Sequence, residues 1–238
     1  MEPMKYVGLA AFLIASVFLF RLFFAFFPKR EYNHVRFMAR VAVFAAISTF
    51  LYVVPIFKFS LPIFPSFLEI HIDEIPAFIA GFAYGPISGI AVIFIKTALK
   101  FVIGGTSTMG VGELTDLILS SIYVFIATFV YNRKRNLKGV AIGFSIATVV
   151  QVLVAMILNV YVMIPFYMNV MNFPLQGLLA MMRAANPAIT DVGWSYAFFA
   201  VLPFNLVKDA IVIVVTFLMY RSLHVFLRFE GKKKKVGR

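Results

Sequence analysis

The chain has 238 residues, of which 62% are hydrophobic and only 13% are charged. A water-soluble domain of this size needs more polar residues to cover its surface, so the composition excludes that class and predicts an all-α membrane protein. The apolar runs are continuous, without the alternation of a membrane β-barrel. The lack of cysteine excludes disulfides, thiol catalysis and thiolate metal sites. The formal net charge of +12 does not indicate a nucleic-acid partner, because the basic residues lie between apolar runs and in a C-terminal tail.

Seven apolar runs follow one another along the chain, and a membrane-spanning helix needs about 20 mostly apolar residues. Gly85-Pro86 predicts a tight turn between two of them, and Asn172 and Pro174 predict a turn followed by a short surface helix. The first run is Val7–Phe27. The others predict a core of six helices: Phe37–Phe57, Ile75–Ala83, Pro86–Ile103, Leu114–Tyr131, Gly139–Pro165 and Trp194–Tyr220.

Clusters of basic residues set the expected orientation in the membrane. If all of these clusters lie in the cytoplasm, six helices are required between Phe37 and Tyr220, and the C-terminus is cytoplasmic. The acidic residues of the intervening segments then fall at or near the outer face: Glu69, Asp73, Glu74, Glu113, Asp116 and Asp191. The expected parts are an N-terminal helix with a basic cytoplasmic linker (1–36), a six-helix substrate-binding domain (37–220) and a basic cytoplasmic tail (221–238).

The N-terminal run Val7–Phe27 has Lys5 before it and Arg21 within it, and no small-residue cleavage site follows Phe20. We therefore expect a retained seventh helix with its N-terminus outside. A helix that lies along the membrane surface is the alternative, because Arg21 needs access to water.

The chain carries few motifs for catalysis. It holds no G-x-x-x-x-G-K-[ST] loop, so ATP hydrolysis by that route is excluded. The Gly-rich stretch GGTSTMGVGE (104–113) lacks the lysine, and we interpret it as an outer loop that caps a helix beginning near Glu113. His34, His71 and His224 lie on different segments and the acidic residues are scattered singly, so neither a metal site nor a metal-dependent lipid enzyme is expected.

Small residues line one side of the first core helix. Ala42 and Ala46 are four residues apart in ARVAVFAAIST (39–49), and Ala45 and Ser48 extend the small surface. This spacing lets helices approach closely in lipid. A docking surface for another subunit and packing inside this chain both remain open.

Polar residues interrupt two of the long apolar runs. Asn159 is a lone amide in MILNVYVMIPFY, and Asn205 and Lys208, three residues apart on the last helix, share a face. Polar groups within the membrane usually face the bundle interior or an aqueous cavity, which makes these residues candidates for ligand binding. The alternative is that Lys208 pairs with Glu113, Asp116 or another acid and holds helices together.

The loop after the first core helix contains SFLEIHIDEIP (66–76), in which polar and apolar residues alternate after Phe67. Alternation predicts an extended, strand-like segment. At the membrane surface such a segment could cover a cavity, and an ordinary connecting loop is the alternative.

Several stretches together resemble a known family, the riboflavin-specific S components (RibU type) of energy-coupling factor (ECF) transporters. The similarity runs in collinear order from Phe37 to Tyr220. GFAYGP is shared by several S components, whereas GVGEL followed by PFNLVK is more specific. The stretches are LPIFPSFLEIHIDEIPAFIAGFAYGPISGIAV (61–92), STMGVGELTDLI (107–118), ILNVYVMIPFY (157–167), NPAIT (186–190) and PFNLVKDAIV (203–212).

The resemblance implies a six-helix vitamin-binding subunit in a prokaryotic cell membrane. Such a subunit has no ATPase of its own and works with a membrane coupling subunit and two ATPases. Riboflavin is its transported substrate rather than a cofactor. The resemblance places Ala42 and Ala46 at the coupling subunit. The implied substrate contacts are Phe67, Leu68, Glu69, Asn159, Asn205 and Lys208.

A flavin suits this composition, since its flat apolar ring needs apolar walls with a few well-placed polar groups. An S component for a different vitamin is one alternative. A membrane-embedded lipid enzyme is an alternative of another class.

Overall fold

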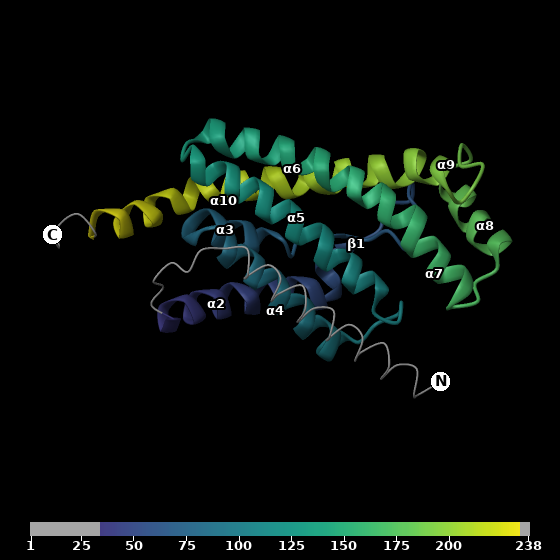
Figure 1. Ribbon diagram of the computed structural model, residues 1–238, viewed down its shortest axis with the longest axis horizontal. Coiled ribbons are helices and arrows are strands. Elements are labelled where there is room, and N and C mark those ends of the chain that lie inside the picture. Colours follow the sequence, from purple (N-terminus) through teal and green to yellow (C-terminus); the bar gives the residue numbers. More distant parts are fainter. Residues whose placement is uncertain (1–33, 234–238) are drawn as a thin grey trace.

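The computed structural model describes residues 34–233, with side chains from Val35 to Met219. Figure 1 shows an elongated bundle whose long helices run along its length, with α8 and α9 at one end and the far end of α10 at the other. The helices are α2 (His34–Val53), α3 (Ile75–Tyr84), α4 (Pro86–Gly104), α5 (Val111–Arg133), α6 (Leu137–Leu158), α7 (Ile164–Asn169), α8 (Leu175–Ala185), α9 (Trp194–Tyr196) and α10 (Leu202–Lys233).

Two π-helical turns join some of these elements. Asn159–Met163 links α6 to α7, and Ala197–Val201 links α9 to α10. The chain is therefore helical without a break from Leu137 to Asn169 and again from Trp194 onward.

The six expected core helices are present in the described part of the chain. Five of them are long and apolar enough to cross a membrane, and α3 is a shorter apolar helix. At about 1.5 Å per residue, α3 is too short to cross about 30 Å of hydrocarbon alone. The expected helix Val7–Phe27 lies outside the described residues.

Two predicted helix ends differ from the structure. The first core helix ends at Val53 and not at Phe57, because Pro55 cannot continue the backbone hydrogen bonds and Val54 before it is extended. The last helix continues past Tyr220 to Lys233. The turn at Gly85 is confirmed: its φ of 109° is a conformation that glycine adopts readily, and it separates α3 from α4.

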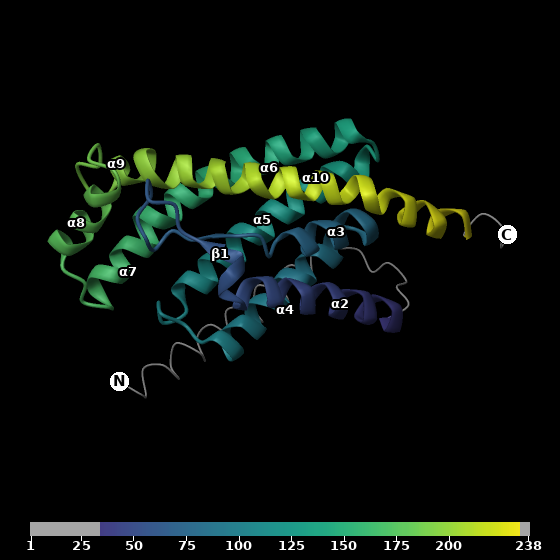
Figure 2. The same ribbon diagram turned by 180° about the vertical axis from the view of Figure 1, so that it is seen from behind.

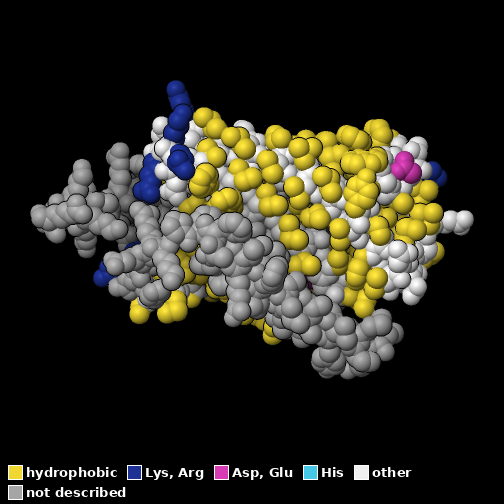
Figure 3. All heavy atoms as spheres, in the orientation of Figure 1, with side chains coloured by type: hydrophobic (Ala, Val, Ile, Leu, Met, Phe, Trp, Pro, Cys, Tyr) yellow, Lys and Arg dark blue, Asp and Glu magenta, His cyan; other side chains and the backbone are white. Residues whose placement is uncertain are grey.

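The surface is typical of a chain surrounded by lipid. Hydrophobic side chains cover most of the face in Figure 3, while most of its basic groups lie at one end and its acidic group at the other. Large exposed apolar residues occur along the helices, including Val149 and Leu153 on α6 and Val214 on α10. In water these side chains would be unfavourable, whereas in hydrocarbon they are not.

The interior is packed with aromatic rings and small residues. Phe78 on α3 contacts Tyr123 on α5 and Phe144 on α6, with both ring-centroid distances 4.9 Å. A Cβ atom at Gly89 on α4 would lie 2.8 Å from the carbonyl oxygen of Ala77, so glycine allows α3 and α4 to approach closely. This packing holds α3 inside the bundle.

The segment between α2 and α3 (54–74) crosses the bundle. It contains β1 (Lys58–Phe59) and β2 (Ile70–His71), which pair antiparallel, and Figure 2 shows it running toward the end where α7, α8 and α9 lie. Phe64 in this segment packs against Phe204 of α10 at 5.4 Å. The extended structure predicted for 66–76 is confirmed only for β2. Turns lie on either side of this strand, and α3 already begins at Ile75.

Candidate binding site

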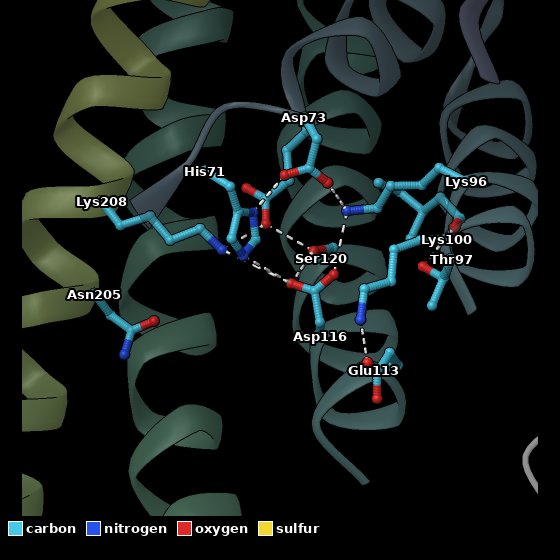
Figure 4. Close-up of polar contacts among 12 residues, drawn as sticks. His71, Asp73, Lys96, Thr97, Lys100, Glu113, Asp116, Ser120, Asn205 and Lys208 are labelled. Carbon is cyan, nitrogen blue, oxygen red and sulfur yellow. Dashed lines mark hydrogen bonds and ion pairs between the residues drawn. The ribbon is translucent and has the colours of Figure 1, made fainter. Parts of the chain in front are cut away.

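Two buried lysines meet three carboxylates inside the bundle. Lys208 of α10 donates to Glu74 Oε1 at 2.9 Å, and Lys96 of α4 lies 3.2 Å from Asp116 of α5 and also bonds Asp73. Figure 4 shows Lys208, Lys96, Asp116 and Asp73 converging from α10, α4, α5 and the segment before α3. The side chains of Lys96 and Asp73 are completely buried, so the pairing offsets the large cost of taking these charges out of water.

His71 and Ser120 complete this group, which we call the ion cluster: Lys96, Lys208, Asp73, Glu74, Asp116, His71 and Ser120. His71 Nδ1 bonds Asp73, and its Nε2 lies 3.8 Å from Asp116. Ser120 Oγ donates to Glu74 Oε1 at 2.7 Å. Burial by itself would raise the pKa of Asp73, but Lys96 and His71 outweigh it and hold the pKa of that carboxyl below its ordinary value.

The ion cluster corrects one expectation from sequence. The acidic residues are not scattered singly: Asp73, Glu74 and Asp116 lie together inside the bundle, around Lys96 and Lys208. Lys96 was missed altogether, although a lysine within the apolar run AVIFIKTALK is a signal for a buried polar partner. Among the described residues, no group of three or more His, Asp or Glu is arranged to hold a metal ion.

Lys208 has acidic partners, as the alternative interpretation required: Asp116, which that interpretation named, and Glu74, which is another acid. Its ammonium lies 2.9 Å from Glu74 and 3.9 Å from Asp116. Glu113 instead pairs with Lys100 and accepts hydrogen bonds from Thr106 and Thr108. These threonines belong to the Gly-rich stretch, and Gly112 at the start of α5 donates to Thr108, so the expected helix-capping loop is confirmed.

The candidate amide Asn159 is the first residue of one π-helical turn, and Asn205 lies four residues after the end of the other. Asn159 Nδ2 donates to the carbonyl of Ala155, and its Oδ1 accepts from the buried Tyr196 hydroxyl at 3.2 Å. Asn205 Nδ2 donates to the carbonyl of Val201 at 2.8 Å. A π-helical turn disturbs the regular backbone hydrogen bonding, and such turns often occur at functional sites. Here the amides bond to helix carbonyls at the edges of the two turns.

Gln151 of α6 is a further polar residue that the sequence did not single out. Its Nε2 donates to Asn205 Oδ1 at 3.0 Å, and its side chain is 2% exposed. Asn205 and Lys208 are each 5% exposed, and Figure 4 shows both extending from α10 toward the same side. The structure thus brings Asn205, Lys208 and Gln151 into one buried region.

The three expected loop contacts differ in burial. Phe67 packs its ring against Tyr167 of α7 and Tyr196 of α9, with centroid distances of 6.4 and 6.2 Å. Leu68 is partly buried and packs against the neighbouring apolar clusters. Glu69 is exposed. The loop therefore reaches the α7–α9 end of the bundle through Phe67 and Leu68.

Ala42 and Ala46 face away from the bundle. Both are exposed, whereas Ala45 and Ser48 are buried against the rest of the chain. The small surface on α2 is thus divided, and only its Ala42–Ala46 side is open to a neighbour.

The fold and the site together define a polytopic helical membrane protein with a polar, ionised group of residues enclosed by apolar helices. Residues 36–220 match the family model for the ECF transporter, substrate-specific component. The chain belongs to this family.

Several curated relatives are similar to this chain over most of their length. The riboflavin transporter RibU of Staphylococcus aureus (strain TCH60) is 29% identical over 191 residues, which cover 79% of this chain and 92% of that protein. The riboflavin transporter FmnP of Bacillus subtilis (strain 168) is 27% identical over 186 residues, 77% of this chain and 91% of that protein.

One solved structure, described as the S component of a bacterial ECF transporter, has the same fold. It superposes with a TM-score of 0.63 at 25% sequence identity, covering 82% of this chain and 99% of that chain. The prediction of an S-component core is therefore confirmed.

Proposed function

We propose that this chain is the riboflavin-binding subunit of an ECF vitamin importer, taking riboflavin from outside the cell. The observation that carries the proposal is the placement of three hydrogen-bonding residues among aromatic and aliphatic side chains at the end of the bundle that Phe67 covers. Asn205 and Lys208 are buried and Asn159 is partly buried. A flat apolar ring with a carbonyl edge and a hydroxylated chain requires this combination. Relatives named as riboflavin transporters support the choice of vitamin.

In this proposal Lys208 and Asn205 contact the bound flavin from α10, while Asn159 contacts it from the π-helical turn after α6. Phe67 and Leu68 cover the ligand from the segment 54–74, and Glu69 lies at the exposed rim. The hydrogen bond to Glu74 gives the Lys208 ammonium an acceptor within the chain, which avoids an unpaired buried charge. A carbonyl of the ligand can then accept a hydrogen bond from another N–H of Lys208, while the bond to Glu74 is kept.

The chain acts with other proteins in transport. We propose that it has no ATPase of its own and depends on a membrane coupling subunit and two ATPase subunits. The exposed Ala42 and Ala46 are the proposed contact with the coupling subunit, because small side chains let a facing helix approach closely. The proposed location is the cell membrane of a prokaryote, with the C-terminus in the cytoplasm, which follows from the basic segments.

Binding of riboflavin is tested with the full chain purified in detergent. Addition of the protein should quench flavin fluorescence with a saturable, one-to-one endpoint. A panel of other vitamins at the same concentration should compete poorly. Protein that leaves riboflavin fluorescence unchanged but binds another vitamin of the panel would establish the alternative S-component function.

Dependence on partners is tested in liposomes that contain this chain alone and hold ATP inside. Labelled riboflavin should bind without accumulating against a gradient. Co-reconstitution with a coupling subunit and its ATPases should give concentrative uptake. Accumulation by the chain alone would contradict the proposal.

A further inference from the structure

Three amide and carbonyl groups form a directed chain between α6 and α10. The backbone carbonyl of Val201 can only accept, so the group of Asn205 that meets it at 2.8 Å must be the NH2. The carbonyl oxygen of Asn205 then faces Gln151, which must present its own NH2 across the 3.0 Å contact. The orientation of both side-chain amides is thereby fixed by a backbone group.

This chain of hydrogen bonds ends in an acceptor. Gln151 Oε1 is buried and has no hydrogen-bond partner among the described residues. An unpaired carbonyl oxygen in a buried site is costly, so such groups usually have a partner when the protein is in its working state. Because the amide orientation is fixed, the missing partner must be a donor, an N–H or an O–H.

Two residues of α10, Asn205 and Lys208, supply hydrogen-bond donors in the same buried region as this acceptor. Asn205 Nδ2 has a second N–H besides the one that bonds Val201, and the Lys208 ammonium has three N–H groups in all. The region therefore offers two donors and one acceptor. A ring edge of carbonyl, N–H and carbonyl, the imide edge of a flavin, needs this same number of donors and acceptors.

We propose that Gln151 is a specificity-determining residue of the binding site, its Oε1 accepting a hydrogen bond from the imide N–H of the bound ring. This inference rests on the proposed function, riboflavin binding. Gln151 bonds directly to Asn205, so a group that contacts Asn205 from the bundle interior is also within reach of Gln151.

The position of Gln151 favours the ring over the ribityl chain as its partner. Gln151 is on α6, and Asn159 is the first residue of the π-helical turn that continues this helix, eight residues or about 12 Å further along the axis. Gln151 is 2% exposed, whereas Asn159 lies next to the α7–α9 end and is only partly buried. An elongated ligand with its apolar ring inward leaves its hydroxylated chain near Asn159, where water is closer.

The test compares three ligands on the full chain in detergent, by fluorescence titration. Riboflavin has the imide N–H and the ribityl chain, N3-methylriboflavin lacks the N–H, and lumiflavin lacks the ribityl chain. The parent protein should prefer riboflavin to N3-methylriboflavin by about tenfold or more. Equal affinity for these two ligands would overturn the inference without any variant.

The variant Gln151→Met keeps the side-chain volume and removes both polar groups. It should weaken riboflavin and lumiflavin equally, by about tenfold, and leave N3-methylriboflavin within about twofold of the parent. Lumiflavin binding that is unchanged in the variant, or equal losses for all three ligands, would overturn the inference. The first would mean a ribityl contact and the second a structural role through Asn205.

A matched control is Thr216→Val on α10. Thr216 is also buried, and its Oγ1 has no hydrogen-bond partner among the described residues. It lies three turns from Asn205, so the substitution should leave all three affinities unchanged. If the parent protein binds no riboflavin, the proposed function itself is wrong, and that outcome is distinct from a parent that binds riboflavin without discriminating at the imide nitrogen.

Discussion

Lys208 of α10 donates a hydrogen bond to Glu74, which directly precedes α3, across 2.9 Å and 134 residues of sequence. The pair joins the helix that carries the proposed ligand contacts to the segment that covers them. Both partners are buried, so the loss of either leaves a charge without compensation. A variant of Lys208 therefore changes stability as well as binding, and the two effects must be separated.

Lys208→Met should weaken riboflavin binding by about ten- to a hundredfold, because a hydrogen bond from a charged donor contributes about 1.5–3 kcal/mol. It should also lower the thermal unfolding temperature, since Glu74 is left unpaired. The double variant Lys208→Met with Glu74→Gln should regain most of the unfolding temperature but not the affinity. Full recovery of affinity in a quenching titration would mean that Lys208 is structural only.

Lys96→Met should destabilise the fold more than any change at Lys208. Lys96 is fully buried and is shared by Asp73 and Asp116, and removing one partner of a buried ion pair typically costs about 3–5 kcal/mol. Thermal unfolding in detergent measures the loss. Adding Asp73→Asn should restore part of it, and a single variant as stable as the parent would contradict the assigned role of the ion cluster.

Tyr196→Phe tests the orientation of Asn159. The hydroxyl of Tyr196 is the donor to Asn159 Oδ1, and the substitution keeps the ring that contacts Phe67. We expect a loss of riboflavin affinity of about three- to tenfold, the value of one neutral hydrogen bond. Tyr161→Phe, at a residue that is 62% exposed, is the control and should bind as the parent does.

Ala42→Trp with Ala46→Trp should abolish assembly with the coupling subunit and leave riboflavin affinity nearly unchanged, because bulky side chains hold a facing helix away. A pull-down with the coupling subunit measures assembly. Ala180→Trp, at an exposed alanine on α8, should assemble normally. An intact complex with the double variant would remove the support for this docking surface.

The sequence by itself determined the class of protein and the positions of the core helices. Apolar runs such as Pro86–Ile103 predict spanning helices because lipid requires every backbone group to be satisfied within the segment. The predicted end of the first core helix was wrong because of Pro55, since a helix cannot pass a proline with its hydrogen bonds intact. The sequence also identified Asn159, Asn205 and Lys208 as candidate site residues, because polar side chains are rare in apolar runs that lie in lipid.

Only the tertiary structure decided the partners of the buried polar groups. The sequence named Glu113 and Asp116 as possible partners for Lys208 and left other acids open. The pairing with Glu74 depends on how α10 packs against the start of α3. Gln151 gave no sequence signal beyond its polarity, and its importance comes from the contact with Asn205 on another helix. Hydrophobic length is a local property of the chain, whereas the partner of a buried charge or amide depends on the rotation and packing of helices far apart in sequence.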